Sequence, residues 1–368
     1  MFISPERLIS LFTDLAKIDG VSRNEKKIRD FICDRFADCI DSLYEDETAS
    51  KVNGNTGNLL LKVRGNDPDR RGIVLSAHMD TVSSTKFLNP IISDGKIKSD
   101  GKTILGADNR LGIAIIFEVL KSLRDNDARF GDIEIVLSVC EEIGLMGIKY
   151  FDFSLLKNKM AYVLDAGNAK VGTVINKAPS SLCFDVNILG MAAHAGIAPE
   201  KGINAIEMAA KGISKIPQGK IDKNTTLNIG VINGGEATNI VPEKVDIRGE
   251  VRSYIDKNID KHFYKIQKVI KNEVAKLGGT VNFNSKQDYK SFYLKPRSEI
   301  LKIADNAYHG GIVLDSSFGA SDANVFNQNG ISSVVLGVGV WEPHTKDEYV
   351  VIDEIIQAAQ WIYNIVSR

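Results

Sequence analysis

The sequence has few of the residues that form disulfide frameworks, membrane spans or nucleic-acid-binding surfaces. Only four of its 368 residues are cysteine, and no two of them are spaced as C-x-x-C. Sparse cysteines in a chain of this length indicate reduced, mostly buried thiols in a cytoplasmic protein. No apolar run reaches the roughly 18 residues that a membrane helix needs. The first residues also lack the basic stretch and apolar run of a signal peptide.

An excess of charge of one sign is also missing. The sequence has 46 basic and 47 acidic side chains, a net charge of -1, and no long basic tract. We therefore expect no nucleic-acid partner. The hydrophobic share is 43% and the charged share 25%, as in ordinary globular proteins. At this length, the composition is sufficient for two domains, each with its own core.

Short apolar runs alternate with amphipathic segments in the first half of the sequence and again near its end. Helices are predicted from Pro5, after Ser22, from about Asn109 to Leu123, and over 352–366. Ser22-Arg23-Asn24-Glu25 has the spacing of a capping box. Alternating strands and helices predict a three-layer αβα catalytic domain with a mixed sheet. The predicted buried strands are 58–63, 72–77, 133–139, 160–164 and 331–338.

A self-contained pattern interrupts this alternation after residue 177. Its order, βαββαβ, predicts a two-layer ferredoxin-like domain inserted into the first one. We expect the catalytic domain to comprise 1–177 and 288–368, and the inserted lid domain to comprise 178–287. The predicted elements of the lid are strands 181–189, 226–233, 244–253 and 279–284 and helices 202–213 and 259–276.

Histidine and acidic residues follow several of the predicted buried strands. Ligands in open α/β sheets gather beyond the carboxyl ends of the strands, so these side chains are candidates for one site. His, Asp and Glu are ligands that suit Zn²⁺ or Mn²⁺. No nucleophilic serine or cysteine motif competes with them. The candidates are His78, Asp80, Asp108, Glu141, Glu142, Asp165 and His344.

Each candidate taken alone also has a purely structural interpretation. His78 could be a partly buried histidine hydrogen-bonded to its neighbour, and Asp108 could be the N-cap of the following helix. The functional interpretation makes Asp108 a bridging ligand between two metal ions, with Asp80 fixing the ring of His78. Glu141 and Glu142 could begin a solvated loop. Alternatively, one could bind metal while the other accepts a proton from water.

The sequence resembles the dinuclear zinc metallopeptidases that include peptidase T, carboxypeptidase G, aminoacylase and succinyl-diaminopimelate desuccinylase. The similarity to the peptidase T-like branch is the greatest. It covers nearly the whole chain. In the catalytic domain the matching strings are SAHMDTV (76–82), GADNRLGIA (106–114), CEEIGLMG (140–147), VLDAG (163–167), FGASDANVF (318–326) and EPHTKDE (342–348). In the inserted domain they are GMAAHAGIAPEKGINAI (190–206) and GGEATNIVP (234–242).

The resemblance implies a role for each candidate. His78 and Asp165 would hold one zinc ion, Glu142 and His344 the other, and Asp108 would bridge them. Glu141 would be the general base, and Asp80 would orient His78. In the lid, His194 would polarise the scissile carbonyl. Asn239 and Arg252 would bind a substrate carboxylate, with Arg248 as the alternative to Arg252.

The expected function is a cytoplasmic aminopeptidase that hydrolyses tripeptides or other short peptides. Two zinc ions would serve each subunit, with manganese or cobalt as substitutes. The lid domain could form a homodimer, and His194 could act in its own or a neighbouring subunit. An N-acyl amino acid amidohydrolase or a carboxypeptidase is the alternative within the family. A binding protein on an inactive hydrolase scaffold is the alternative from another class.

Overall fold

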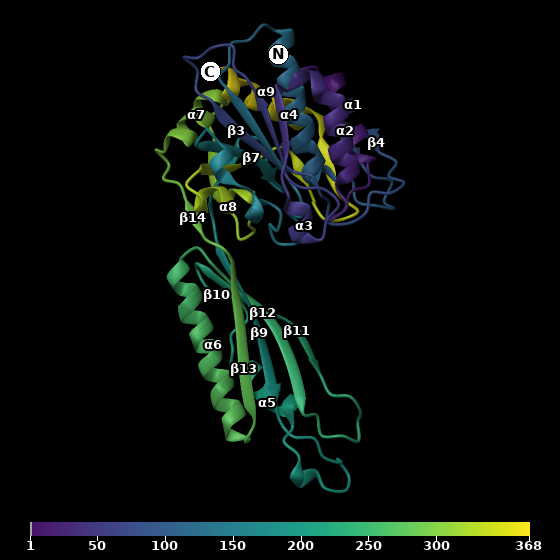
Figure 1. Ribbon diagram of the computed structural model, residues 1–368, viewed down its shortest axis with the longest axis vertical. Coiled ribbons are helices and arrows are strands. Elements are labelled where there is room, and N and C mark those ends of the chain that lie inside the picture. The colour runs from purple at the N-terminus through teal and green to yellow at the C-terminus, as the bar shows by residue number, and fades with distance from the viewer. Residues whose placement is uncertain (1) are drawn as a thin grey trace. The chain divides into compact units, whose positions relative to one another are not determined.

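The computed structural model describes residues 2–368, which form two compact units (Figure 1). Unit 1 runs to Lys177 and resumes over Tyr293–Arg368, and unit 2 is Ala178–Phe292. The predicted inserted segment starts at the same residue but ends at 287. Unit 2 extends further because strand β13 (Thr280–Tyr289) keeps its pairing with β9 (Ser180–Leu189) as far as Tyr289 and Ser181.

Unit 1 is built on a nine-stranded mixed sheet in the order β1-β2-β6-β3-β7-β16-β8-β14, with β15 paired to β8. The neighbours β6-β3-β7-β16 are all parallel, whereas β2 is antiparallel to β6 and β8 to β16. The strands are β1 (Ser42–Glu45), β2 (Leu59–Val63), β3 (Ile73–His78), β6 (Ile133–Ser138), β7 (Met160–Ala166), β8 (Thr173–Ala178), β14 (Phe292–Tyr293), β15 (Val313–Ser316) and β16 (Ser332–Gly337).

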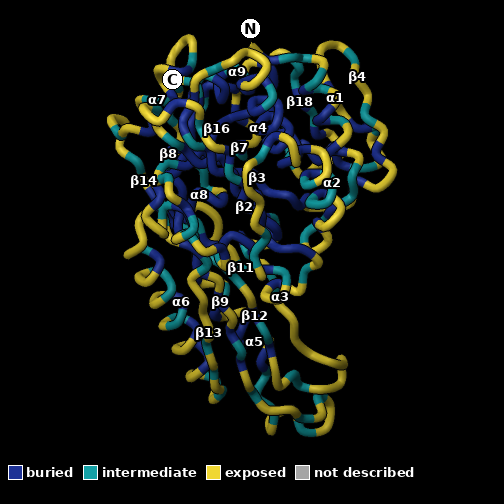
Figure 2. The backbone as a smooth tube through the Cα atoms, turned by 45° about the horizontal axis from the view of Figure 1, so that its top comes forward, coloured by how far each residue is buried: buried dark blue, intermediate teal, exposed yellow. Residues whose placement is uncertain are grey.

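Both faces of this sheet are covered. All six residues of β3 and of β6 are buried, which explains why their sequences are apolar without alternation. Helix α4 packs on β3 and β7, while α8 packs on β7 and β16 (Figures 1 and 2). The predicted α/β fold is confirmed. The helices of unit 1 are α1 (Pro5–Ala16), α2 (Lys26–Phe36), α3 (Thr48–Val52), α4 (Ala107–Asp125), α7 (Glu299–Ala307), α8 (Asp322–Gln328) and α9 (Ile352–Ser367).

A second, antiparallel sheet of unit 1 has the order β17-β18-β5-β4. It joins the segment that follows β3 to the segment before the last helix, because β18 pairs with β5. Both segments therefore approach the same part of unit 1. The strands are β4 (Ile91–Ser93), β5 (Lys96–Lys98), β17 (Val340–Trp341) and β18 (Tyr349–Val351).

Unit 2 is a five-stranded antiparallel sheet in the order β10-β11-β12-β9-β13, packed on two helices. Its order is the predicted βαββαβ with one addition, the short strand β10. Apolar residues of the sheet and both helices form one core, which includes Val186, Met208, Val245, Ile266 and Ile270. The elements not yet given are α5 (Ala205–Ile213), β10 (Gly219–Asp222), β11 (Thr225–Gly234), β12 (Lys244–Ser253) and α6 (Asp256–Lys276).

The predicted capping box at Ser22–Glu25 is wrong. Helix α2 begins only at Lys26, and the side chain of Glu25, at its N-cap position, makes no capping hydrogen bond. The hydroxyl of Ser22 instead donates to Asp80, and the carboxylate of Glu25 accepts from the backbone of Arg23 and Cys140. The side chains of Ser22 and Glu25 therefore bond to residues distant in the sequence and do not cap the helix.

Among the described residues, no helix combines the length and apolar character needed to cross a membrane.

Candidate functional site

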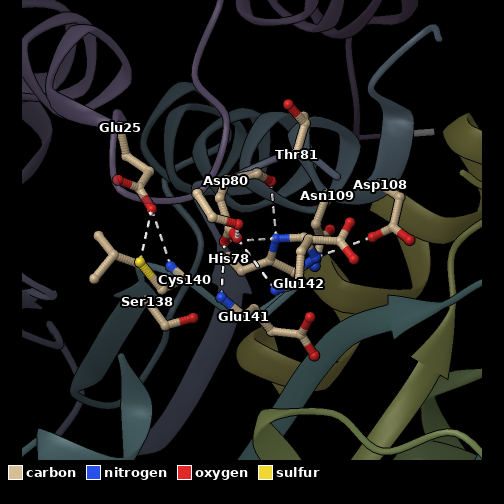
Figure 3. Close-up of polar contacts among 12 residues, drawn as sticks. Glu25, His78, Asp80, Thr81, Asp108, Asn109, Ser138, Cys140, Glu141 and Glu142 are labelled. Atoms are coloured by element: carbon tan, nitrogen blue, oxygen red, sulfur yellow. Dashed lines mark hydrogen bonds and ion pairs between the residues drawn. The ribbon is translucent and has the colours of Figure 1, made fainter. Parts of the chain in front are cut away.

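The carboxyl ends of the parallel strands of unit 1 bring the predicted ligands together. His78 is the last residue of β3, and Glu142 follows β6 (Figure 3). Asp165 lies near the end of β7. His344 lies between β17 and β18. Parallel strands end at one edge of the sheet, so residues far apart in the sequence become neighbours there.

The carboxylate of Asp108 lies between two pairs of these residues. Its Oδ1 is 3.0 Å from His78 Nε2, which is also 3.3 Å from Asp165 Oδ1. Its Oδ2 is 3.1 Å from His344 Nε2, which is also 3.0 Å from Glu142 Oε2. One carboxylate thus presents a different oxygen to each pair. This arrangement is suitable for a bridging ligand of two metal ions.

The backbone around Asp108 departs from a helix. Asp108 and Asn109 have non-helical dihedral angles at the start of α4, and the peptide bond between them is cis. Regular helix begins at Arg110, and Asn109 rather than Asp108 is its N-cap, because Asn109 Oδ1 accepts from the backbone N–H of Gly112 at 3.2 Å. The side-chain amide of Asn109 donates to Asp165 Oδ1 at 2.9 Å. Asn109 therefore supports one of the predicted ligands, and Asp108 just before it is another.

A buried glutamate holds the loop that carries Asp108. Glu348 Oε2 accepts from the backbone N–H of Gly106 at 2.7 Å, and Oε1 accepts from that of Asp108 at 3.0 Å. Its side chain is fully buried. Glu348 is the last letter of the matching string EPHTKDE, but its sequence position alone gave no reason to assign it a role.

Asp80 has more partners than the predicted one. Its Oδ1 lies 3.3 Å from His78 Nδ1, whose nearer partner is the Asp80 carbonyl oxygen at 3.0 Å. Its two carboxylate oxygens also accept from the backbone N–H groups of Glu141 at 3.0 Å and Glu142 at 3.1 Å. Asp80 therefore orients the histidine and the acidic pair together. Hydrogen bonds from its neighbours hold the pKa of Asp80 below its usual value despite burial.

Glu141 and Glu142 lie in a turn, not at the end of a strand as predicted. Strand β6 ends at Ser138, and Cys140 adopts a left-handed φ of 54°. The turn gives the two side chains different environments. Glu142 contacts His344, whereas burial, followed by the nearby charges of Asp165 and other carboxylates, raises the pKa of Glu141 well above its usual value.

The carboxylates and imidazoles of the cluster shift one another's pKa values. Burial and the neighbouring Asp108 raise the pKa of Asp165 to about 7. Hydrogen bonds to Asp108 and Glu142 raise the pKa of His344 to about 10. Burial lowers the pKa of His78, but the effects of Asp165, Asp108 and Asp80 are larger together, so the pKa lies well above its usual value. A nearby carboxylate favours the charged form of an imidazole and the neutral form of another carboxylate.

The donor set fits divalent metal ions. His78, Asp108 and Glu142 each offer a ligand atom, and these atoms lie within 4.8 Å of one another. Glu142 Oε1 is buried and has no hydrogen-bond partner among the described residues. This oxygen is therefore available as a metal ligand. Imidazole nitrogen and carboxylate oxygen are the ligands that zinc accepts, and manganese accepts them as well.

A further buried acid lies beside the site. Asp322, at the start of α8, accepts a short hydrogen bond from Ser138 Oγ, and burial raises its pKa to about 6. Its Oδ1 has no hydrogen-bond partner among the described residues. The string FGASDANVF contains this residue, but an acid at a helix start is also an ordinary capping residue. The sequence therefore did not single it out.

The predicted catalytic residue His194 and the predicted substrate-binding residues Asn239 and Arg252 lie in unit 2, where they form two separate groups. His194 is exposed and pairs through the backbone with Ile240, and Ala195 N–H donates to the carbonyl of Asn239 at 2.9 Å. Arg252 lies near the other end of β12, opposite Ser181, and its guanidinium contacts Glu250 Oε2 at 3.1 Å. One copy of unit 2 does not bring Asn239 and Arg252 together.

Two family models match parts of the chain. A peptidase dimerisation domain of the M20 type matches residues 176–277, and the M42 glutamyl aminopeptidase model matches residues 90–211. The first match covers most of unit 2, and the second runs from β4 into α5.

Known proteins are similar over most or all of the chain. The aminopeptidase PepT from Bacillus cereus ATCC 10987 is 35% identical with a TM-score of 0.93, covering 100% of this chain and 99% of that one. A tripeptidase from Staphylococcus aureus Mu50 is 34% identical with a TM-score of 0.95 at the same coverage. Peptidase T from Clostridium perfringens (strain ATCC 13124) is 30% identical, covering 74% of this chain and 68% of the relative.

Proposed function

The chain belongs to the peptidase T-like branch of the M20 peptidases, and from that premise we propose that it is a metal-dependent aminopeptidase that cleaves tripeptides and other short peptides. The observation that carries the proposal is the placement of Asp108 between two pairs of ligands. His78 and Asp165 would hold one zinc ion, and Glu142 and His344 the other. Manganese or cobalt could replace zinc, because both accept the same donors.

The metal ions, when bound, would supply a water molecule acidic enough to lose its proton near neutral pH. Glu141 would accept that proton at a carboxylate oxygen. Its buried position raises its pKa, which suits a group that takes a proton and later returns it to the leaving amine. Asp80 would hold the ring of His78 and the backbone of Glu141 in fixed positions during the reaction.

His194 would stabilise the oxyanion that forms on the substrate. The backbone N–H of Gly196 donates to His194 Nδ1 at 3.2 Å, so a neutral ring carries its proton on Nε2. An Nε2–H group is a hydrogen-bond donor, as stabilisation of a negatively charged oxygen requires. The exposed position of His194 in unit 2 leaves this donor available to a substrate.

The geometry of unit 2 supports a homodimer in which two chains contribute to one substrate site. Arg252 lies eight residues along β12 from Lys244, and Asn239 lies beyond that end, beside His194. At about 3.3 Å per residue, the strand separates them by roughly 26 Å or more. A tripeptide does not span that distance. If His194, Asn239 and Arg252 all contact one substrate, they come from different copies of the chain. The match to a dimerisation domain supports the same proposal.

The remaining proposal concerns the compartment. Cys39 and Cys140 are buried free thiols, Cys33 is partly buried, and Cys183 is exposed. Free thiols agree with a reducing, cytoplasmic environment.

The test is a cleavage assay with a free tripeptide and its N-acetyl derivative, with and without a chelator. We expect release of the N-terminal amino acid from the free tripeptide, loss of activity on chelation, and recovery with Zn²⁺, Mn²⁺ or Co²⁺. Preferential cleavage of the N-acetyl compound would support the amidohydrolase alternative instead. Full turnover by the metal-stripped protein would contradict a metallopeptidase. Metal binding without any hydrolysis would favour a binding protein.

A further inference from the structure

Glu25 is a fully buried carboxylate to which the proposed mechanism gives no role. We propose that Glu25 is a positioning residue that holds the turn Cys140–Glu142 in its reactive conformation. The proposal rests on the proposed function, because that function gives Glu141 and Glu142 their roles. Glu25 would act through Cys140, the first residue of the turn, rather than through a predicted metal ligand.

The contacts of Glu25 are directed at this turn. Its Oε1 accepts from the backbone N–H of Cys140 at 3.0 Å, and Cys140 Sγ lies at 3.5 Å (Figure 3). The same oxygen accepts from the backbone N–H of Arg23 at 2.9 Å. No side-chain hydrogen bond links Glu25 to the helix that it precedes. A carboxylate in the N-cap position of α2 therefore stabilises a segment 115 residues away in the sequence.

The turn needs such support because of its backbone conformation. Cys140 has a φ of 54°, a left-handed conformation that a side chain with a Cβ atom disfavours. Three consecutive N–H groups of the turn accordingly have buried carboxylate acceptors. Glu25 accepts from Cys140, and Asp80 accepts from Glu141 and Glu142. Loss of the first acceptor would leave an unsatisfied buried N–H at the residue just before the general base.

The segment before α2 supports Asp80 as well. Ser22 Oγ donates to Asp80 Oδ2 at 2.6 Å, so Ser22 and Glu25 act on adjacent parts of the same turn. The positive charge of the buried Arg110 attracts both Asp80 and Glu25 and offsets part of their negative charge. Arg110 also donates to the carbonyl of Gly20 at 3.2 Å, where an added Cβ would approach Arg110 Nη2 to 2.8 Å.

These contacts distinguish positioning from general support of the fold. Glu134 provides a matched comparison on the strand that leads into the turn, because it is also a buried carboxylate that accepts two backbone N–H groups. Its partners are Lys157 at 3.1 Å and Asn158 at 2.8 Å, near the start of β6 rather than beyond its end. Removal of Glu134 should therefore destabilise the sheet without moving the turn.

The experiment compares Glu25→Ala, Glu25→Gln and Glu134→Ala with the wild type in full-length protein. Measurements are kcat and KM for a free tripeptide at saturating metal, the affinity for Zn²⁺, and the melting temperature. Glu25→Ala should lower kcat by up to roughly 10²-fold, the loss expected when a distant change displaces a reacting group by about 1 Å. Zinc affinity should fall as well, because the turn carries Glu142, and the change in KM should be smaller. Glu25→Gln keeps an oxygen acceptor for both N–H groups and should recover most of the loss. Glu134→Ala should lower the melting temperature while kcat stays near that of the wild type.

Two results would overturn the positioning role. One is a kcat and zinc affinity of Glu25→Ala within twofold of the wild type. The other is a loss of kcat in Glu134→Ala as large as that in Glu25→Ala when the two variants have lost equal amounts of melting temperature. Failure of the proposed function would look different, because the wild type itself would then not hydrolyse the peptide. The zinc affinities of the variants would still test whether Glu25 holds the segment that carries Glu142.

Discussion

Glu348 accepts a hydrogen bond from the backbone N–H of Asp108 at 3.0 Å, across 240 positions of the sequence. The same carboxylate accepts from Gly106, so both of its oxygens are used on one short loop. That loop carries the carboxylate that lies between His78 and His344. The position of Asp108 therefore depends on a residue four positions after His344.

The first prediction concerns this support. Glu348→Gln replaces one acceptor oxygen with an NH₂ group that cannot accept from a backbone N–H. The loop should shift, and zinc affinity should fall by roughly 10–100-fold. Isothermal titration of the metal-free variant with Zn²⁺ measures the change. Asp347→Asn, at the exposed neighbouring position, is the control and should bind zinc like the wild type. Unchanged zinc affinity in Glu348→Gln would contradict this role.

The second prediction separates the two adjacent glutamates. Glu141→Ala should keep both metal ions, because the predicted ligand is Glu142, which contacts His344 at 3.0 Å. Turnover should nevertheless fall by at least about 10²-fold, since no other group would accept the proton of the attacking water. Metal analysis and steady-state kinetics on the same sample measure both effects. Near-normal turnover would rule out Glu141 as the base.

The third prediction concerns the second pair of ligands. His344→Ala removes the imidazole that contacts Asp108 and Glu142, so one metal equivalent per chain should be lost. Metal content after dialysis, measured by inductively coupled plasma mass spectrometry, gives the number directly. His309→Ala changes an exposed histidine outside the site and should keep the wild-type content. Two tightly bound ions in His344→Ala would contradict the assignment.

The fourth prediction concerns the pH dependence of stability without metal. The pKa of Asp165 is raised from 3.8 to about 7, so its folded form holds a proton that the unfolded form has lost, and stability falls as pH rises through that interval. The pKa of His344 is raised from 6.5 to about 10. Its contribution to the free energy of unfolding is therefore complete below pH 6.5 and is lost as pH rises through 10. The lowered pKa of Asp108 acts only below its ordinary value of 3.8.

The melting temperature of the chelated protein should therefore decrease between about pH 5 and pH 9. His344→Ala should make the decrease above about pH 6.5 smaller, and the raised pKa of His78 should account for most of the decrease that remains there. Added zinc should stabilise the protein more at the higher pH, because metal ions compete with protons for the same ligands. Differential scanning calorimetry with chelator and with zinc tests both statements. A melting temperature that rises over this interval in chelator would contradict them.

Much of the fold could be predicted because it depends on local pattern. The apolar runs at 72–77 and 133–139 correspond to β3 and β6 with boundaries within one residue, because a strand buried on both faces must be almost entirely apolar. The segment that resembles a ferredoxin-like domain likewise forms one antiparallel sheet with two helices. Where local pattern and tertiary contact competed, as at Ser22 and Glu25, prediction from the pattern failed.

The site divides in the same way. The types of residue and their order along the chain indicated the chemistry, because only a few side chains bind divalent metal ions and they stood at the ends of buried strands. The supporting residues Asn109, Glu25 and Glu348 were not predicted. Their role is to bond particular N–H groups or side chains, and such partners exist only once the chain has folded.

The sequence by itself determined which atoms are available for catalysis: two imidazoles and a set of carboxylates in a chain whose strands alternate with helices. Only the tertiary structure decided how they are divided. It placed one oxygen of Asp108 against His78 and the other against His344. It also set Glu141 apart from Glu142 by a left-handed turn at Cys140. The physical reason is that the spacing of residues along a chain does not specify the direction of a side chain, whereas buried hydrogen bonds at a turn do.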